Sequence, residues 1–157
     1  MKKTNIFILM LLLIALYIQS APSTKPLTFD DFIRLKQVSD PQISPKGDLI
    51  AFVVTEMNKE GNTSNSDIWI IPSRGGEPWR LTSSPKADSN PRWSPDGKKI
   101  AFWSSRDGNG DIYVMNTDGS EQKRLTNNHS FDDSPSWSPD GRKIAFASTM
   151  DGNPEIY

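Results

Sequence analysis

The chain has 157 residues, with 18 lysines and arginines against 19 aspartates and glutamates, and a formal net charge of −1. This balance excludes a strong single-sign field of the kind that attracts nucleic acid or an anionic membrane surface, so no nucleic-acid partner is expected. The absence of cysteine excludes disulfides, thiolate chemistry and cysteine-rich zinc sites.

Residues 1–20 have the pattern of a secretory signal peptide. Lys2 and Lys3 form the positively charged start, and an unbroken apolar run of 13 residues extends from Ile6 to Ile18. A run of this length suits a signal-peptide core and is shorter than the ~20 residues of a membrane-spanning helix. We expect cleavage after Ser20, export to the periplasm or the extracellular space, and no membrane span after cleavage. An uncleaved anchor helix is the alternative.

Residues 21–37 are predicted to form a polar spacer and then a short amphipathic helix. Thr28 can cap this helix, and Asp31, three residues later, can answer it in a variant of the capping box. We expect the helix to extend from Phe29 to about Gln37 and to pack against the segment that follows it.

A nine-residue segment occurs three times from residue 44 onward. Its copies are Ser44–Phe52, Ser94–Phe102 and Ser138–Phe146, and the last two read SPDGKKIAF and SPDGRKIAF. Their prolines are 50 and then 44 residues apart, a period that is typical of repeat architectures. The repeat is therefore the main organising feature of the chain.

The second copy predicts four short antiparallel strands. They are expected at 91–94, 99–104, 111–116 and 121–126, with turns between them that contain glycine after aspartate or asparagine. Apolar residues on both faces of the middle strands indicate that these strands lie between two layers. Four such strands in each repeat describe one blade of a β-propeller. The first copy carries six extra residues, which we expect to form a solvated surface loop at Glu56–Ser66.

The predicted fold class is all-β, a partial β-propeller preceded by a signal peptide and a short helix. We expect blades at about 38–87, 88–131 and 132–157, the last of them truncated. Propellers close with about four to eight blades. An open arc of two full blades and part of a third leaves apolar faces exposed, so we expect this chain to be a fragment whose missing C-terminal remainder completes the ring.

Two resemblances narrow the choice of protein. The pattern Pro-x-Trp-Ser-Pro-Asp-Gly-x-Lys-Ile-Ala-Phe, followed by Asp-Ile-Tyr-Val-Met-Asn-x-Asp-Gly and Arg-Leu-Thr, resembles the TolB-type propeller repeat. Residues 27–45 resemble the entry to the propeller in exported peptidases of the prolyl oligopeptidase family. In that family a short helix leads directly into the first repeat, and an α/β-hydrolase catalytic domain follows the propeller. TolB itself places a whole α/β domain before its propeller, and here only about 20 residues separate the predicted leader from the repeat.

Candidate catalytic residues are few. No segment reads Gly-x-Ser-x-Gly, so the nucleophile elbow of an α/β-hydrolase is absent from the sequence. His129 is the only histidine, and Ser130 and Asp132 are close to it in the chain. A catalytic base needs a nucleophile beside it and a group that orients it, and this loop indicates neither. A solvated loop residue is the favoured interpretation of His129.

Repeated aspartates and tryptophans have structural interpretations as well as functional ones. The aspartates are Asp96, Asp107, Asp111, Asp118, Asp140 and Asp151, and the tryptophans are Trp69, Trp79, Trp93, Trp103 and Trp137. The aspartates match a calcium loop only in part, and aspartate before glycine is typical of hairpin turns. Most of the tryptophans recur at fixed repeat positions, which favours packing between blades over a stacking platform for sugars or bases. We therefore expect no catalytic, cofactor-binding or metal-ligating residue and no cofactor in this chain.

The leading hypothesis is the non-catalytic N-terminal propeller part of an exported serine peptidase of the prolyl oligopeptidase class, which gates or positions peptide substrates. The alternative is a TolB-like propeller of the cell envelope that binds proteins or peptides without enzymatic activity. A glycan-binding propeller is a third hypothesis, supported only by the tryptophans without a clear repeat position. A Gly-x-Ser-x-Gly segment encoded beyond Tyr157 would distinguish the first hypothesis from the second.

Overall fold

The computed structural model describes residues 26, 28, 31, 33–58 and 60–157. The chain divides into two units, Met1–Phe32 and Ile33–Tyr157, and the fold below is that of the second unit. The predicted signal peptide lies outside the described residues. Among the residues that are described, no helix is long and apolar enough to cross a bilayer.

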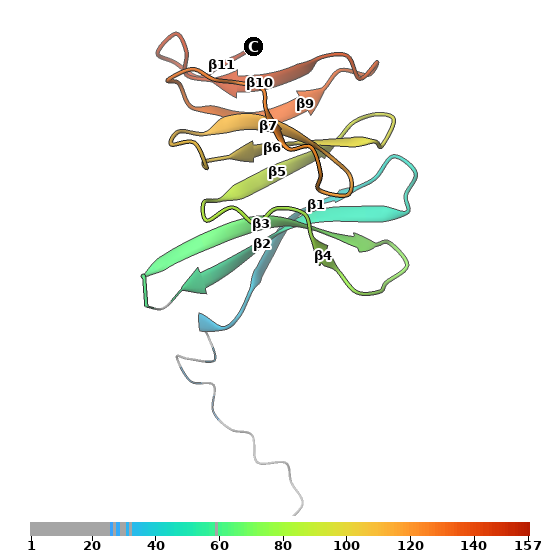
Figure 1. The fold of residues 1–157 in the computed structure, drawn as a ribbon, viewed down its shortest axis with the longest axis vertical. Coiled ribbons are helices and arrows are strands. Elements are labelled where there is room, and N and C mark those ends of the chain that lie inside the picture. Colours follow the sequence, from blue (N-terminus) through green and yellow to red (C-terminus); the bar gives the residue numbers. More distant parts are fainter. Residues whose placement is uncertain (1–25, 27, 29–30, 32, 59) are drawn as a thin grey trace, which may run out of the picture. The chain divides into compact units, whose positions relative to one another are not determined.

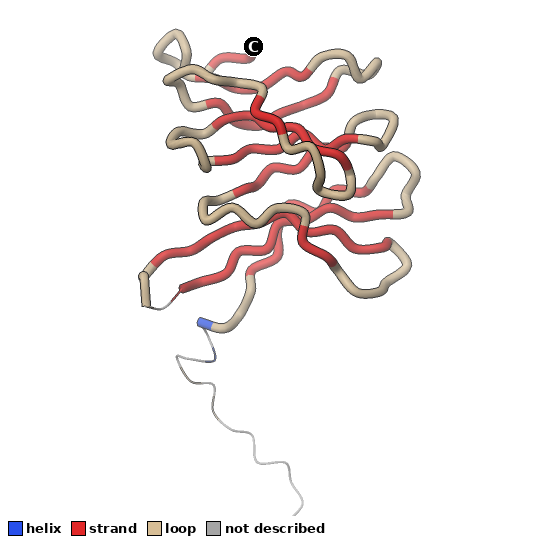
Figure 2. The backbone as a smooth tube through the Cα atoms, viewed as in Figure 1, coloured by secondary structure: helices blue, strands red, loops and turns tan. Residues whose placement is uncertain are grey.

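Three antiparallel sheets make up the second unit (Figures 1 and 2). Blade 1 contains β1 (Gln37–Ile43), β2 (Leu49–Asn58), β3 (Thr63–Pro72) and β4 (Trp79–Arg80). Blade 2 contains β5 (Asp88–Trp93), β6 (Lys99–Ser104), β7 (Asp111–Asn116) and β8 (Lys123–Arg124). Blade 3 contains β9 (Asp132–Trp137), β10 (Ile144–Ser148) and β11 (Glu155–Ile156). Strands adjacent in sequence are adjacent in each sheet, which confirms the predicted partial propeller.

A short helical turn precedes blade 1. The Thr28 N–H donates to Asp31 Oδ2 (2.9 Å) and the Asp31 N–H donates to Thr28 Oγ1 (3.2 Å), the reciprocal pair of a capping box. The Thr28 hydroxyl and N–H also hold the pKa of the Asp31 carboxyl below its usual value. Helical backbone is described at Asp31 and Ile33, whereas Lys36 is irregular and Gln37 begins β1. The helix therefore ends before its predicted end, because the backbone from Gln37 onward pairs with β2.

Each nonapeptide copy forms the turn between the first two strands of its blade. In blade 2 the Ser94 N–H donates to the Lys99 carbonyl (2.8 Å) and the Gly97 N–H donates to the Ser94 carbonyl (2.9 Å), and the same pair of bonds closes the other two turns. Gly97 has a φ of 70°, which residues with a Cβ rarely adopt. The predicted strands at 99–104 and 111–116 are confirmed as β6 and β7.

The first and fourth strands of blade 2 differ from their predicted limits. β5 begins at Asp88 and not at residue 91, because the chain pairs with β6 on both sides of a bulge at Asn90. Asn90 has a φ of 53° and precedes a proline, and Asp40 and Ser134 repeat this geometry in blades 1 and 3. The fourth strand of blade 2 is confined to Lys123–Arg124, because Glu121, with a φ of 52°, still belongs to the turn.

The six extra residues of blade 1 lengthen a β-hairpin. β2 and β3 pair without interruption as far as Asn58 and Thr63, so the predicted surface loop at Glu56–Ser66 is wrong. The Thr55 and Ser66 hydroxyls are 2.8 Å apart across the two strands. Pairing prevails because hydroxyl and amide side chains on facing strands bond to each other, so that a polar sequence can continue a sheet. The long hairpin of blade 1 projects beyond the corresponding turns of the other blades in Figure 1.

The apolar core lies between blades 1 and 2. We call the side of a blade that contacts the preceding blade its leading face, and the opposite side its trailing face. The trailing face of blade 1 contributes Ala51, Ile68, Ile70 and Leu81, and the leading face of blade 2 contributes Ile100, Phe102, Tyr113 and Met115. All eight are at most 6% exposed. On β6 the intervening Ala101 is also fully buried, as predicted for a strand between two layers.

Candidate functional site

Adjacent blades are joined by an indole hydrogen bond that recurs at one repeat position. Trp93 Nε1 donates to the Gln42 carbonyl (2.9 Å), and Trp137 Nε1 donates to the Arg92 carbonyl (3.0 Å). Gln42 and Arg92 occupy equivalent positions in blades 1 and 2, each two residues after the bulge. The predicted role of Trp93 and Trp137 in packing between blades is confirmed, and both indoles find the polar partner that a largely buried tryptophan needs.

Polar side chains connect the first strands of neighbouring blades. Arg92 Nη1 lies 2.8 and 3.1 Å from the two carboxylate oxygens of Asp40. Asn90 Nδ2 donates to Asp133 Oδ1 (2.6 Å) between blades 2 and 3. Asp40 and Asn90 are bulge residues, so the bulge directs a polar side chain toward the next first strand. The sequence carried a signal for this feature, a polar residue before proline at the same place in each repeat.

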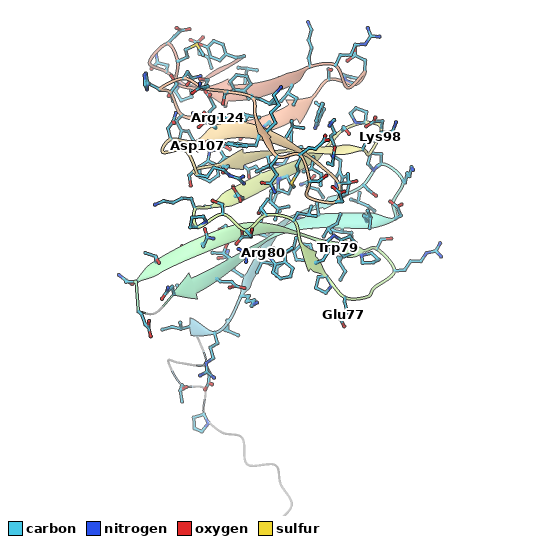
Figure 3. All side chains as sticks on the ribbon, viewed as in Figure 1. Glu77, Trp79, Arg80, Lys98, Asp107 and Arg124 are labelled. Carbon is cyan, nitrogen blue, oxygen red and sulfur yellow. The ribbon has the colours of Figure 1, made fainter. Side chains whose placement is uncertain are left out.

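The Arg-Leu-Thr segment of each complete blade binds a buried aspartate. In blade 1, Arg80 Nη2 is 2.6 Å from Asp67 Oδ2, Arg80 Nε donates to the Thr82 carbonyl (2.6 Å), and Thr82 Oγ1 donates to Asp67 Oδ1 (3.3 Å). Burial raises the pKa of the Asp67 carboxyl, and Arg80 opposes this effect. Blade 2 repeats the arrangement with Asp111, Arg124 and Thr126. Figure 3 shows Arg80 and Arg124 at corresponding places in the two sheets.

Arg106 pairs with a third buried carboxylate, that of Asp88, which is fully buried. Arg106 Nη2 lies 3.0 Å from both oxygens of Asp88, and Arg106 Nε donates to Ser104 Oγ (2.8 Å). The guanidinium also lies over the rings of Tyr113 and Phe102, at 4.8 and 5.5 Å from their centroids. Sequence analysis missed this cluster, because neither blade 1 nor blade 3 repeats the Asp–Arg pair.

Blade 3 contains the counterpart of Asp88 without the arginine. Asp132 is fully buried, and its carboxylate accepts hydrogen bonds from Ser148 Oγ and from Asn128 Nδ2 (3.0 Å). Met150, 48% exposed, occupies the position that Arg106 has in blade 2. Asp132 is thus held by neutral donors alone among the side-chain hydrogen bonds of the described residues.

Met150→Arg is expected to raise the free energy of unfolding by about 1–2 kcal/mol, because the new guanidinium can bind Asp132 as Arg106 binds Asp88. Phe146 and Tyr157 stack at 6.2 Å and offer the same ring surface as Phe102 and Tyr113. Urea unfolding measures the change. Met57→Arg is the matched control, since Met57 is 56% exposed on the hairpin of blade 1. Equal effects of the two substitutions would contradict the prediction.

The structure places His129 on the exposed part of the loop between β8 and β9. Asp132 lies under this loop, and both of its oxygens are already bonded to Asn128 and Ser148. The Ser130 N–H donates to Asn128 Oδ1 (2.7 Å), which orders the loop. These contacts support the interpretation of His129 as a loop residue.

Three of the repeated aspartates take part in turn hydrogen bonds. Asp96 accepts from Ser94 Oγ (2.6 Å), Asp140 accepts from Ser138 Oγ (2.6 Å), and Asp118 accepts from the Ser120 hydroxyl and N–H. In each case the serine hydroxyl holds the pKa of the carboxyl below its usual value. Asp107 and Asp151 accept from the hydroxyls of Tyr113 and Tyr157, and Asp107 Oδ2 is also 3.8 Å from Arg124 Nη1 (Figure 3). Within the described ranges, no three acidic or histidine side chains gather as a metal site.

The remaining tryptophans differ in their environments. Trp103 tilts against Phe131 with ring centroids 5.9 Å apart, and Lys36 Nζ lies 5.8 Å from the ring centroid of Trp69. Trp79 is 41% exposed on β4 at the outer edge of blade 1 (Figure 3). Strand pairing makes Lys123 the counterpart of Trp79 in blade 2, so a tryptophan does not recur at this repeat position.

A cavity of about 360 Å³ lies between blades 2 and 3. Its lining includes Ile112, Val114 and Leu125 from blade 2 and Trp137, Ile144 and Phe146 from blade 3. The same repeat positions form the core between blades 1 and 2. There the side chain of Met115 also packs into the core. Lys99, Thr126, Arg142 and Lys143 also line the cavity, which is part of the packing between the two blades.

Each sheet is a meander of antiparallel strands, and neighbouring sheets pack face to face through the same repeat positions. This arrangement defines the blades of a β-propeller. The chain belongs to the PD40 family, described as the TolB beta propeller domain, whose model matches residues 33–157.

Known proteins similar to this chain include peptidases and TolB proteins. The uncharacterized peptidase YuxL of Bacillus subtilis is 41% identical over 86 residues, which are 54% of this chain and 13% of that protein. The structure of a putative TolB from Agrobacterium tumefaciens is 37% identical, with a TM-score of 0.60, and the match covers 74% of this chain and 40% of that one. An acylaminoacyl peptidase from Pyrococcus horikoshii is 28% identical, with a TM-score of 0.60, and covers 74% of this chain and 18% of its own. The chain thus spans a small part of these peptidases.

Proposed function

We propose that this chain is the non-catalytic propeller part of an exported serine peptidase of the prolyl oligopeptidase class. The observation that carries the proposal is the 41% identity to a peptidase over 86 residues, together with a match to only 13% of that protein. The direct passage from the capped turn at Thr28 into β1 supports it, because no α/β domain stands between the predicted leader and blade 1. Nucleophile, acid and base would come from a hydrolase domain outside residues 1–157.

In this proposal the propeller gates or positions peptide substrates for the catalytic domain. The first strands of the blades carry hydrogen-bonding groups, Asp40, Arg92, Asn90 and Asp133, that are half-buried and already ordered by their contacts with one another. Polar groups held in place in this way suit a passage for a peptide, because they can exchange hydrogen bonds with its backbone at little cost in side-chain entropy. The peptide class is inferred from the name of the relative and from the resemblance at residues 27–45.

The test is to read the coding sequence beyond Tyr157. Further repeats followed by Gly-x-Ser-x-Gly, and then by an aspartate and a histidine, are expected. The native product should react with a fluorophosphonate probe at that serine, and residues 1–157 alone should neither react nor hydrolyse peptidyl substrates. Hydrolysis by the 157-residue chain, abolished by His129→Ala, would contradict the proposal.

The second candidate is a TolB-like propeller that binds proteins in the cell envelope without enzymatic activity. The 37% identity to a putative TolB favours it. A coding sequence that stops once the repeats can close a ring would select this candidate, and co-purification of an envelope protein with the native product would then support it. In both candidates residues 1–20 direct export, and mass spectrometry of the mature N-terminus after Ser20 tests that assignment.

A further inference from the structure

The chain enters and leaves each complete blade at the same end of its sheet. Gln37 begins β1 opposite Thr55, beside the β2–β3 hairpin, and β4 runs back toward this hairpin because it is antiparallel to β3. β5 and β9 likewise begin beside the β6–β7 and β10–β11 turns of their own blades. We call this side of the propeller the hairpin end, and the side with the nonapeptide turns the opposite end.

An even number of strands in a blade has the same consequence for every further blade built on this plan. A segment that follows the last blade therefore starts at the hairpin end, whatever the number of blades. In a closed ring the last blade also lies next to blade 1, so such a segment starts beside the hairpin of blade 1. The match to YuxL covers 13% of that peptidase, so a protein of that length has a large segment outside the matched blades.

The hairpin of blade 1 projects past this end (Figure 1). β6 ends at Ser104, whose counterpart in β2 is Val54, whereas β2 continues for four more residues to Asn58. At about 3.3 Å for each residue, the hairpin extends about 13 Å beyond the strands of blade 2. Strand pairing inside blade 1 sets this projection, so it does not depend on the blades that complete the ring.

Hydrogen bonds order the projecting part at its tip and at its base. At the tip, Asn58 Oδ1 accepts from the N–H groups of Glu60 (3.0 Å) and Gly61 (3.1 Å). At the base, Asn65 Nδ2 donates to the carbonyl of Ser84 in the loop between β4 and β5 (2.8 Å). The hairpin is therefore an ordered projection that is tied to the blade, and it can hold a partner in one position.

The projecting part carries two features that suit a protein partner. Met57 places an apolar side chain there that is 56% exposed. β1 pairs with β2 only as far as Thr55, so the backbone of residues 56–58 has no strand beside it on that edge within the part of the chain that the structure describes. An open edge can pair with an extended segment of a partner, and folded proteins commonly cover such edges.

We propose, building on the proposed peptidase, that the hairpin of blade 1 docks against the hydrolase domain that follows the propeller. The domain starts at the hairpin end, next to blade 1, and the hairpin projects from this same place. Met57 and the open edge of β2 form the contact. The hairpin then fixes the domain over the hairpin end, while the nonapeptide turns at the opposite end stay clear of it.

The experiment is photo-cross-linking of the native product, with benzoylphenylalanine placed at residue 57 in one preparation and at residue 98 in another. Cross-links from residue 57 should reach peptides encoded beyond the repeats, in the domain that carries the fluorophosphonate-reactive serine. Lys98 is the matched control, because it is also exposed but lies in a nonapeptide turn at the opposite end (Figure 3). Residue 98 should give no cross-link to that domain.

Cross-links from residue 57 that stay within the repeats, in a product whose serine still reacts with the probe, would overturn the docking and leave the proposed peptidase in place. Equal cross-linking of the domain from residues 57 and 98 would also overturn the docking, because the domain would not be held at the hairpin end. A native product without a probe-reactive serine would contradict the proposed peptidase itself, and the docking with it.

Discussion

Arg106→Ala is expected to lower the free energy of unfolding by about 3–5 kcal/mol, one of the two largest effects that we expect of a single substitution. The substitution leaves the carboxylate of Asp88 fully buried without the guanidinium that lies 3.0 Å from both of its oxygens. Removing one partner of a buried pair costs more than the pair itself contributes, because the remaining charge stays desolvated. The rings of Phe102 and Tyr113 lose a packed cation at the same time. Urea unfolding followed by tryptophan fluorescence measures the loss.

Two further variants separate the loss of stability caused by the unpaired charge from the loss caused by missing packing contacts. Asp88→Asn in the Arg106→Ala background removes the unpaired charge and should recover part of the lost stability. Arg80→Ala is the matched control, because Arg80 also binds a buried aspartate but is itself 41% exposed, so water can replace it more easily. A loss below about 1 kcal/mol for Arg106→Ala, or an equal loss for Arg80→Ala, would contradict the assignment.

Local turn chemistry explains why the repeat could be predicted from the sequence. The hydrogen bonds of Ser94, Gly97 and Lys99 close within six residues, so they depend little on the rest of the fold. The limits of β6 and β7 follow, because a turn on each side leaves the strand no freedom in length. The predicted loop at Glu56–Ser66 was wrong because a polar composition indicates exposure but does not distinguish an exposed hairpin from an irregular loop.

Contacts between blades were predictable as a class but not as pairs. The repetition of Trp93 and Trp137 indicated packing between blades, yet their acceptors are backbone carbonyls, which carry no sequence signal. Arg106 and Asp88 are 18 residues apart, and blade 3 repeats the aspartate as Asp132 but not the arginine, so neither spacing nor repetition linked the pair.

The second large effect is expected at the interface between blades 1 and 2. Trp93→Ala should lower the free energy of unfolding by about 3–5 kcal/mol, because it removes a large side chain packed against the core and leaves a cavity between the blades. Trp93→Phe keeps most of the apolar volume and removes the indole N–H that donates to the Gln42 carbonyl. Its cost should be about 1 kcal/mol, the net contribution of one such hydrogen bond.

Trp79→Ala is the control for Trp93→Ala, since both change the same residue type and Trp79 is exposed on β4 (Figure 3). It should change stability by less than about 0.5 kcal/mol. Amide hydrogen exchange adds a positional test, because weakening this interface should lower protection in β1 and β5 together while the hairpin tip stays unchanged. Equal losses in the free energy of unfolding for Trp93→Ala and Trp79→Ala would show that Trp93 contributes no more to stability than an exposed tryptophan does. The predicted difference between them follows only if repeated tryptophans join the blades.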